Sequence, residues 1–165
     1  MGTNESRAHG IPTFSTPENV EKIEYYNTTF ELPLRSETTD GQFLMIRQRE
    51  IPADAAPPFH VHTNEDEIWI VNGGTFRFWI GGSSLATAEI FDLGPGGVVY
   101  GPRNVPHTFQ SMDGLGDVTL LLSPADSQDY FLNVGQADSR KGTEDHHQLK
   151  RIGVHVLDRA PVDGQ

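Results

Sequence analysis

Short apolar stretches recur along most of the chain, and turn-forming residues separate them. The stretch GQFLMIRQREI (41–51) opens at a glycine, and the stretch EIWIVNGG (67–74) ends in glycines, as strands bounded by turns do. Asn72-Gly73 is a tight-turn dipeptide. We therefore predict a β-hairpin in which TFRFWIGG (75–82) is the returning strand.

Further stretches of the same kind follow one another at a spacing of roughly 8–12 residues, which is typical of an antiparallel sandwich or barrel. The pattern shows no internal repeat and no linker, so it predicts one all-β domain over 21–165, with its barrel at about 40–125. The other predicted strands lie in KIEYYNTTFELPL (22–34), FHVH (59–62), TAEIFDLGPGG (87–97), VVYGPRNVPHTFQS (98–111) and DVTLLLSPA (117–125).

The two ends of the chain differ from this pattern. Residues 1–20 are polar and interrupted by prolines, so we expect a flexible tail. Residues 126–160 are predicted to be a helical segment that packs outside the barrel. It holds one helix in SQDYFLNVG (127–135), closed by Gly135, and a second in TEDHHQLKRIG (143–153), capped by Thr143.

Composition excludes several classes of function. The chain has 165 residues, a formal net charge of -11 and no cysteine. The acidic balance argues against nucleic acid or an anionic membrane as a partner, because both bind basic surfaces. Without cysteine, any metal must be held by nitrogen and oxygen ligands. No apolar stretch has the length of a signal peptide or a membrane span, so we expect a soluble, cytoplasmic protein.

Two histidines and a glutamate are spaced as metal ligands would be. His60 and His62 lie two apart in a predicted strand, and alternate side chains of a strand share one face. A short turn, TNED, follows them, and the next strand can bring Glu67 beside the two imidazoles. Two imidazoles and one carboxylate leave coordination positions open, as catalytic transition-metal sites require.

A third histidine can join this group. His107 follows a turn set by Pro102, Asn104 and Pro106, which fixes where the strand restarts. Three imidazoles and one carboxylate favour iron, nickel, cobalt, manganese, copper or zinc over calcium or magnesium. We therefore predict one divalent transition metal on each chain, of an identity that the sequence leaves open.

These residues resemble the cupin family. HVHTNEDEIWIVNGG (60–74) fits the first cupin signature, HxHx4Ex6G, and GPGGVVYGPRNVPH (94–107) fits the start of the second, Gx5PxGx2H. The C-terminal segment is also similar to that of small quercetin-dioxygenase-like cupins. The resemblance implies a jelly-roll (double-stranded β-helix) barrel, a metal held inside it by His60, His62, Glu67 and His107, and a homodimer.

The chain departs from the family pattern at three positions. Asp54 stands where the first signature usually opens with glycine, and Ser111 replaces the asparagine that ends the second. Asn104 occupies the position of the turn glycine; asparagine tolerates left-handed backbone geometry, so we expect the turn to survive. None of the three removes a ligand.

Aromatic residues on the same strands are candidates for substrate contact. Trp69 shares a face with Glu67, and both Phe109 and Ser111 share one with His107. Phe76 and Phe78 form one face of their strand, and the sequence does not say whether that face is inside. Because such residues commonly serve as core, we treat these five as candidates only.

Other charged residues are expected to be solvated. Arg47 and Arg49 share one strand face and are candidates for an anion-binding pair, but we expect them to be solvated edge charges. Glu65 and Asp66 are expected to be solvated neighbours of Glu67. The remaining histidines of the C-terminal segment, His146, His147 and His155, lack a comparable setting and are expected at the surface.

Three functions fit these residues. The first is a metal-dependent, quercetinase-like dioxygenase that acts on a small enolic or phenolic substrate and O2, with Glu67 as both ligand and general base. The second is an isomerase, cyclase or lyase that uses the metal as a Lewis acid without O2. The third is a non-catalytic small-molecule-binding cupin, because fold does not fix function.

Overall fold

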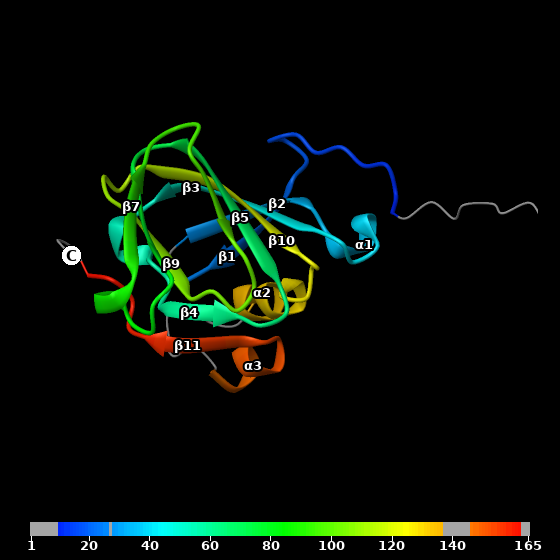
Figure 1. Ribbon diagram of the computed structural model, residues 1–165. Helices are drawn as coiled ribbons and strands as arrows, with labels where there is room; N and C mark the ends of the chain where they lie inside the picture. Colours follow the sequence, from blue (N-terminus) through cyan, green and yellow to red (C-terminus); the bar gives the residue numbers. More distant parts are fainter. Residues whose placement is uncertain (1–9, 27, 137–145, 163–165) are drawn as a thin grey trace, which may run out of the picture.

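Two antiparallel β-sheets face each other across the core (Figure 1). The computed structural model describes residues 10–26, 28–136 and 146–162. One sheet has the strand order β1 (Glu21–Tyr25), β2 (Thr28–Leu34), β3 (Leu44–Ile51), β10 (Gly116–Ser123), β5 (Asp66–Gly73) and β8 (Val98–Gly101). The other has the order β11 (Val154–Asp158), β4 (Phe59–His62), β9 (His107–Ser111), β6 (Phe76–Ile80) and β7 (Glu89–Leu93).

Short helical elements connect or flank the strands. They are α1 (Ser36–Thr39), α2 (Gln128–Gln136) and α3 (His146–Arg151), with single 3-10 turns η1 (Ala53–Ala55) and η2 (Leu85–Thr87). The predicted all-β jelly-roll with short C-terminal helices is therefore confirmed.

Alternating burial along the strands explains why these sequences pair in this register. In β10, Val118, Leu120 and Leu122 are buried while the residues between them are partly exposed. In β5, Trp69 and Val71 face the core, whereas Ile70 on the other face is 39% exposed. This period of two fixes the register, because a slip of one residue would move the apolar side chains into solvent.

The strand β6 has its phenylalanines inside. Phe76 and Phe78 are fully buried. Phe78 lies with its ring centroid 5.8 Å from that of Trp69 and 6.0 Å from that of Phe109. On the opposite face Arg77 pairs with Asp92 of β7, at 2.7 Å between the guanidinium nitrogen and the carboxylate oxygen. The inward face of this strand, which the sequence did not determine, is therefore the one that carries Phe76 and Phe78.

The C-terminal segment is not wholly helical, contrary to expectation. Residues 154–158 form β11, which pairs with β4 so that Val154 lies opposite His62 and Val156 opposite His60. Gly153, with φ +81°, turns the chain from α3 into this strand, and a Cβ there would lie 2.6 Å from Thr63 Oγ1. A helical pattern ends at this glycine because its backbone supplies a conformation that other residues rarely adopt.

The first C-terminal helix also differs from its prediction. Helix α2 continues through Gly135 to Gln136, so Gly135 does not end it. It packs on β1, with the rings of Phe131 and Tyr25 5.4 Å apart. The helix therefore packs against the first strand of the larger sheet, which precedes the predicted barrel. Thr143, the expected cap of the second helix, lies outside the described residues.

The N-terminal residues 10–20 contain no strand or helix. The backbone N–H of Ile11 donates to the carbonyl oxygen of Thr38 at 2.7 Å, which ties this segment to α1. The first nine residues of the expected tail lie outside the described part of the chain. The hairpin β1–β2 then adds two strands to one side of the predicted barrel.

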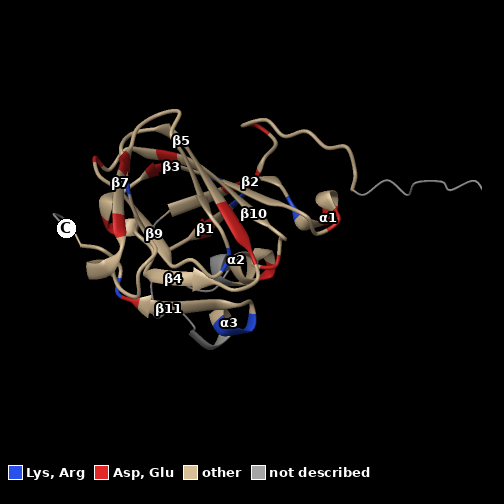
Figure 2. Cartoon of the chain, in the orientation of Figure 1, with Lys and Arg blue, Asp and Glu red and all other residues tan. Residues whose placement is uncertain are grey.

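Charged positions are spread over the whole fold (Figure 2). Acidic residues occur in both sheets, as Asp66 at the start of β5 and Glu89 at the start of β7 show. Lys150 and Arg151 make the end of α3 basic. None of the helices in the described ranges is both long enough and apolar enough to span a bilayer.

We expect Phe78→Ala to lower the free energy of unfolding by about 3–5 kcal/mol, because it leaves a cavity in the aromatic core. Phe91→Ala is the matched control. Phe91 of β7 lies opposite Phe78 of β6 but is 45% exposed. Its replacement by alanine should therefore lower the free energy of unfolding by less than about 1 kcal/mol. Urea unfolding followed by tryptophan fluorescence measures both, and equal losses would contradict this account of the core.

Candidate metal centre and cavity

Four side chains from both sheets meet inside the barrel. His60 and His62 come from β4, His107 from β9 and Glu67 from β5, and one ligand atom of each lies within 4.8 Å of all the others. We call these four residues the histidine–glutamate cluster. The strands bring His60 directly opposite His107. The cluster predicted from spacing is therefore present as a group that could hold one metal ion.

The turn before β9 sets the position of His107. Asn104 adopts φ +67°, so the left-handed turn survives the loss of glycine, as expected. The backbone N–H of Asn104 donates to the carbonyl oxygen of His62 at 2.7 Å and fastens the turn to β4. Before the turn, Gly101 has no side chain and so leaves room for Trp69. A Cβ at this position would lie 2.8 Å from the Trp69 ring, which is too close.

Each imidazole of the cluster has an acceptor at its Nδ1 atom. His60 Nδ1 lies 2.7 Å from the carbonyl oxygen of Pro58, and His107 Nδ1 lies 2.9 Å from that of Val105. A carbonyl oxygen can only accept, so in both rings Nδ1 carries the hydrogen. His62 Nδ1 lies 3.2 Å from a carboxylate oxygen of Glu65. In a neutral ring, Nε2 is then left with its lone pair.

These lone pairs face one another. His60 Nε2 lies 3.1 Å from His62 Nε2, and His107 Nε2 lies 3.1 Å from Glu67 Oε2. Both atoms of the second pair are buried, and neither has a hydrogen bond of proper geometry among the described residues. Buried polar atoms normally have partners. A cation placed between these atoms would satisfy them all, so the residues fit a nitrogen- and oxygen-bound transition metal.

The cluster favours the protonation states that bind metal. Burial, followed by the neighbouring imidazoles of His107 and His62, lowers the pKa of His60 to about 3, so this ring is neutral at pH 7. Burial alone would raise the pKa of Glu67, but contact with His107 and the charges of the imidazoles lower it to about 2. Neutral imidazole and ionised carboxylate are the ligand forms.

The pKa of His62 moves in the other direction. Its burial alone would lower the value, but Glu65 and Glu67 outweigh this and raise the pKa above the ordinary one. Of these two neighbours, Glu67 carries a negative charge at neutral pH, which a divalent cation would neutralise.

The expectation that Glu65 is solvated was wrong. Its side chain is buried, and it accepts hydrogen bonds from the backbone N–H of Ser127, at 2.7 Å, and from the Ser127 hydroxyl. Asp66 is partly exposed and pairs with Arg103, at 3.0 Å between Oδ2 and the guanidinium nitrogen. Two adjacent carboxylates of one turn thus point into different environments.

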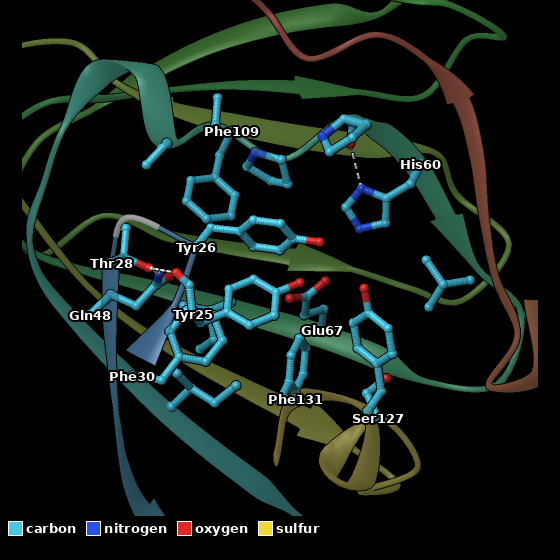
Figure 3. Close-up of a pocket in the computed structure, with 18 of the residues that line it drawn as sticks. Tyr25, Tyr26, Thr28, Phe30, Gln48, His60, Glu67, Phe109, Ser127 and Phe131 are labelled. Atoms are coloured by element: carbon cyan, nitrogen blue, oxygen red, sulfur yellow. Dashed lines mark hydrogen bonds between the residues drawn. The ribbon is translucent and has the colours of Figure 1, made fainter. Parts of the chain in front are cut away.

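A cavity of about 660 Å³ opens beside the cluster (Figure 3). Three of the four cluster residues, His60, His62 and Glu67, line it. Most of the other lining side chains are apolar or aromatic. Tyr25, Tyr26, Phe109 and Phe131 are drawn around the same pocket as Glu67 (Figure 3).

The five candidate substrate residues separate into two groups. Trp69 and Phe109 line the cavity, and Trp69 also packs edge-on against His107 with ring centroids 4.9 Å apart. Phe76 and Phe78 do not line it and belong to the core behind Phe109. Ser111 is buried opposite Phe76, near Asp113.

Several lining residues were missed by sequence reasoning. Tyr25, Tyr26 and Phe30 come from the hairpin β1–β2, and Tyr130 and Phe131 come from α2. All lie outside the two cupin signatures. The only local sign was the dense aromatic content of EYY and DYF, which equally predicts ordinary core.

The two arginines of β3 have ionic partners. Arg47 forms a two-pronged pair with Asp117, and Arg49 pairs with Glu31. The expectation of edge charges was wrong, because β3 lies inside its sheet, between β2 and β10. His155 is half-buried in β11 opposite Val61. The side chains of His146 and His147 lie outside the described residues.

Comparison with known proteins agrees with this geometry. Residues 48–123 match the family model of the cupin domain. Quercetin 2,3-dioxygenase from Aspergillus japonicus is 32% identical over 77 residues, which make up 46% of this chain and 21% of that enzyme. The chain thus matches about a fifth of the length of that relative.

Solved structures show the same fold at low identity. KdgF from Halomonas sp. has a TM-score of 0.57 and 18% identity, over 68% of this chain and 94% of that one. An RmlC-like cupin from Shewanella frigidimarina has a TM-score of 0.57 and 17% identity, over 74% of this chain and 99% of that one. An oxalate decarboxylase from Bacillus subtilis has a TM-score of 0.58 and 12% identity, over 95% of this chain and 45% of that one.

We expect the protein, purified without chelator or immobilised-metal resin, to contain close to one divalent transition-metal ion for each chain. His60→Ala should lose most of this metal, because it removes one of four converging ligands. His155→Ala is the control, since His155 lies outside the cluster. Elemental analysis measures all three proteins. Absence of metal from the wild type, even after reconstitution, would exclude a metal centre.

Proposed function

Because the chain belongs to the cupin superfamily and carries a four-ligand cluster beside an aromatic cavity, we propose that it is a metal-dependent, quercetinase-like dioxygenase. Its substrate would be a small enolic or phenolic compound, and O2 the co-substrate. The observation that carries the proposal is the meeting of two features: a buried set of unsatisfied nitrogen and oxygen ligands, and an apolar cavity that reaches it.

The cavity has the size and chemistry of a site for a flat organic molecule. Its volume of about 660 Å³ lies within the range of ordinary ligand sites. Phe109, Tyr25 and Tyr26 present aromatic surface to this space, and such surface packs well on an aromatic substrate. Glu67, His60 and His62 line the same cavity, so a substrate oxygen can approach the cluster while the rings hold the rest of the molecule.

A divalent ion bound to the cluster would act as a Lewis acid and lower the pKa of a coordinated hydroxyl. The chain itself supplies an acceptor for the released proton. The neighbouring imidazoles lower the pKa of Glu67 and keep its carboxylate ionised at neutral pH, and Glu67 lines the cavity, so an acceptor oxygen lies within reach of a bound hydroxyl. We assign Glu67 two roles, as ligand and as general base for the substrate hydroxyl.

The walls of the cavity would keep water away from the reacting atoms. Phe30, Phe131 and Leu120 line the cavity with apolar atoms, and α2 adds Tyr130 to its wall. Exclusion of water protects reactive intermediates from side reactions. This requirement is stronger for O2 chemistry than for simple ligand storage, and it favours the dioxygenase over a binding protein.

The likeness to quercetin 2,3-dioxygenase supports the proposal. The matched residues make up 21% of that enzyme, so a quercetin-like substrate for this chain is part of the proposal only. A homodimer also belongs to the proposal. All four cluster residues come from one chain, so each protomer would keep a complete site.

We expect metal-loaded protein to consume O2 when it is supplied with a flavonol such as quercetin, and to consume both in proportion. An oxygen electrode and the flavonol absorbance measure the two rates. His60→Ala should abolish the reaction, while His155→Ala should preserve it. Turnover without O2 uptake would favour an isomerase, cyclase or lyase. Binding without turnover, across a panel of enolic aromatics, would favour a binding cupin.

We expect Glu67→Gln to lower turnover by about 10²-fold or more, because the amide cannot accept the hydroxyl proton. Comparison at equal metal occupancy, measured by elemental analysis, separates the loss of base from the loss of ligand. Asp66→Asn is the neighbouring control, since Asp66 pairs with Arg103 away from the cluster. A Glu67→Gln protein with full metal and full turnover would exclude the dual role.

A further inference from the structure

Glu65 has a buried carboxylate and is not one of the four predicted metal ligands. It is 1% exposed, and a buried carboxylate is costly unless it is paired and hydrogen-bonded. Its Oε1 accepts the backbone N–H of Ser127, and its Oε2 accepts the Ser127 hydroxyl. The same Oε2 lies 3.2 Å from His62 Nδ1. Both oxygens are therefore directed by specific donors.

His62 is held differently from the other two imidazoles. His60 and His107 direct Nδ1 to backbone carbonyls, whereas His62 directs it to the Glu65 carboxylate. Such an acceptor fixes the tautomer of a ligating histidine, orients its ring and makes it a stronger electron donor. The strength of His62 as a metal ligand would therefore depend on a side chain that can be mutated, whereas His60 and His107 contact the backbone.

Ser127 connects this contact to a distant part of the chain. It is fully buried and directly precedes α2. It also lies beyond residue 123, where the match to the cupin domain ends. The same segment supplies Tyr130 and Phe131 to the cavity wall. One serine therefore joins the helix that lines part of the cavity to the carboxylate that contacts a cluster histidine.

We propose that Glu65 is a positioning residue for His62, and that Ser127 holds Glu65 in place, so that the C-terminal segment is coupled to the metal centre. This rests on the metal-binding part of the proposed function and not on its O2 chemistry.

The test uses Glu65→Gln and Ser127→Ala in the full chain, with Asp66→Asn as the matched control. Glu65→Gln removes the charge at nearly constant volume, and Ser127→Ala removes one of the two donors that hold Glu65. Asp66→Asn removes an adjacent carboxylate that binds Arg103 instead. Affinity for Co²⁺ is measured by competition with a chromophoric chelator, and the visible absorption spectrum is recorded at saturating Co²⁺.

We expect Glu65→Gln to weaken Co²⁺ binding by about 10- to 100-fold and to change the spectrum of the saturated protein. Ser127→Ala should change both in the same direction by a smaller factor. Asp66→Asn should match the wild type. The spectrum separates the two roles of Glu65, because a residue that only stabilises the fold would not alter ligand geometry in protein that is folded and saturated.

Each other outcome contradicts a distinct claim. A wild-type affinity and spectrum in Glu65→Gln would overturn the positioning role and leave the metal centre intact. Absence of Co²⁺ binding in the wild type would overturn the metal centre itself. Circular dichroism of the metal-free proteins shows whether each is folded. If Glu65→Gln is unfolded, the spectrum of Ser127→Ala decides, and a wild-type spectrum there would overturn the coupling.

Discussion

The site depends on buried imidazole nitrogens that face each other without a hydrogen between them. Once Val105 fixes Nδ1 as the donor in His107, the lone pair of its Nε2 faces Glu67 Oε2, and both atoms are buried without a hydrogen-bond partner in the described part of the chain. A fold that assembles such a group must offset the loss of hydration with another partner. The cluster is thus unfavourable by itself, and the most direct compensation is a cation bound at its centre.

This requirement explains why the cluster lies between the two sheets. The histidines come from β4 and β9 of one sheet, and Glu67 comes from β5 of the other. An ion held by all four would therefore link the sheets across the core. Binding free energy would become folding free energy, because the unfolded chain has no preformed site. The aromatic core formed by Trp69, Phe78 and Phe109 supports the ligands from behind.

The sequence predicted those parts of the molecule that short-range geometry determines. Alternation along a strand places His60 and His62 on one face, and the turn around Asn104 places His107. Glu65 was misjudged because its partner, Ser127, lies 62 residues away, and spacing says nothing about so distant a contact. Residues 154–158 were misjudged for the same reason: β11 exists because β4 offers an edge with which it can pair. The cavity wall likewise depends on tertiary packing.

The origin of the cavity wall bears on how far a shared fold can determine chemistry. The ligands lie within the part of the chain that matches the cupin domain, at residues 48–123. Tyr25, Phe30, Tyr130 and Phe131 lie outside it, on β1, β2 and α2. Relatives that share the barrel can therefore share the cluster and differ in much of the cavity wall. Metal chemistry at the cluster would then be a property of the barrel, whereas selection among substrates would depend in large part on these two flanking segments.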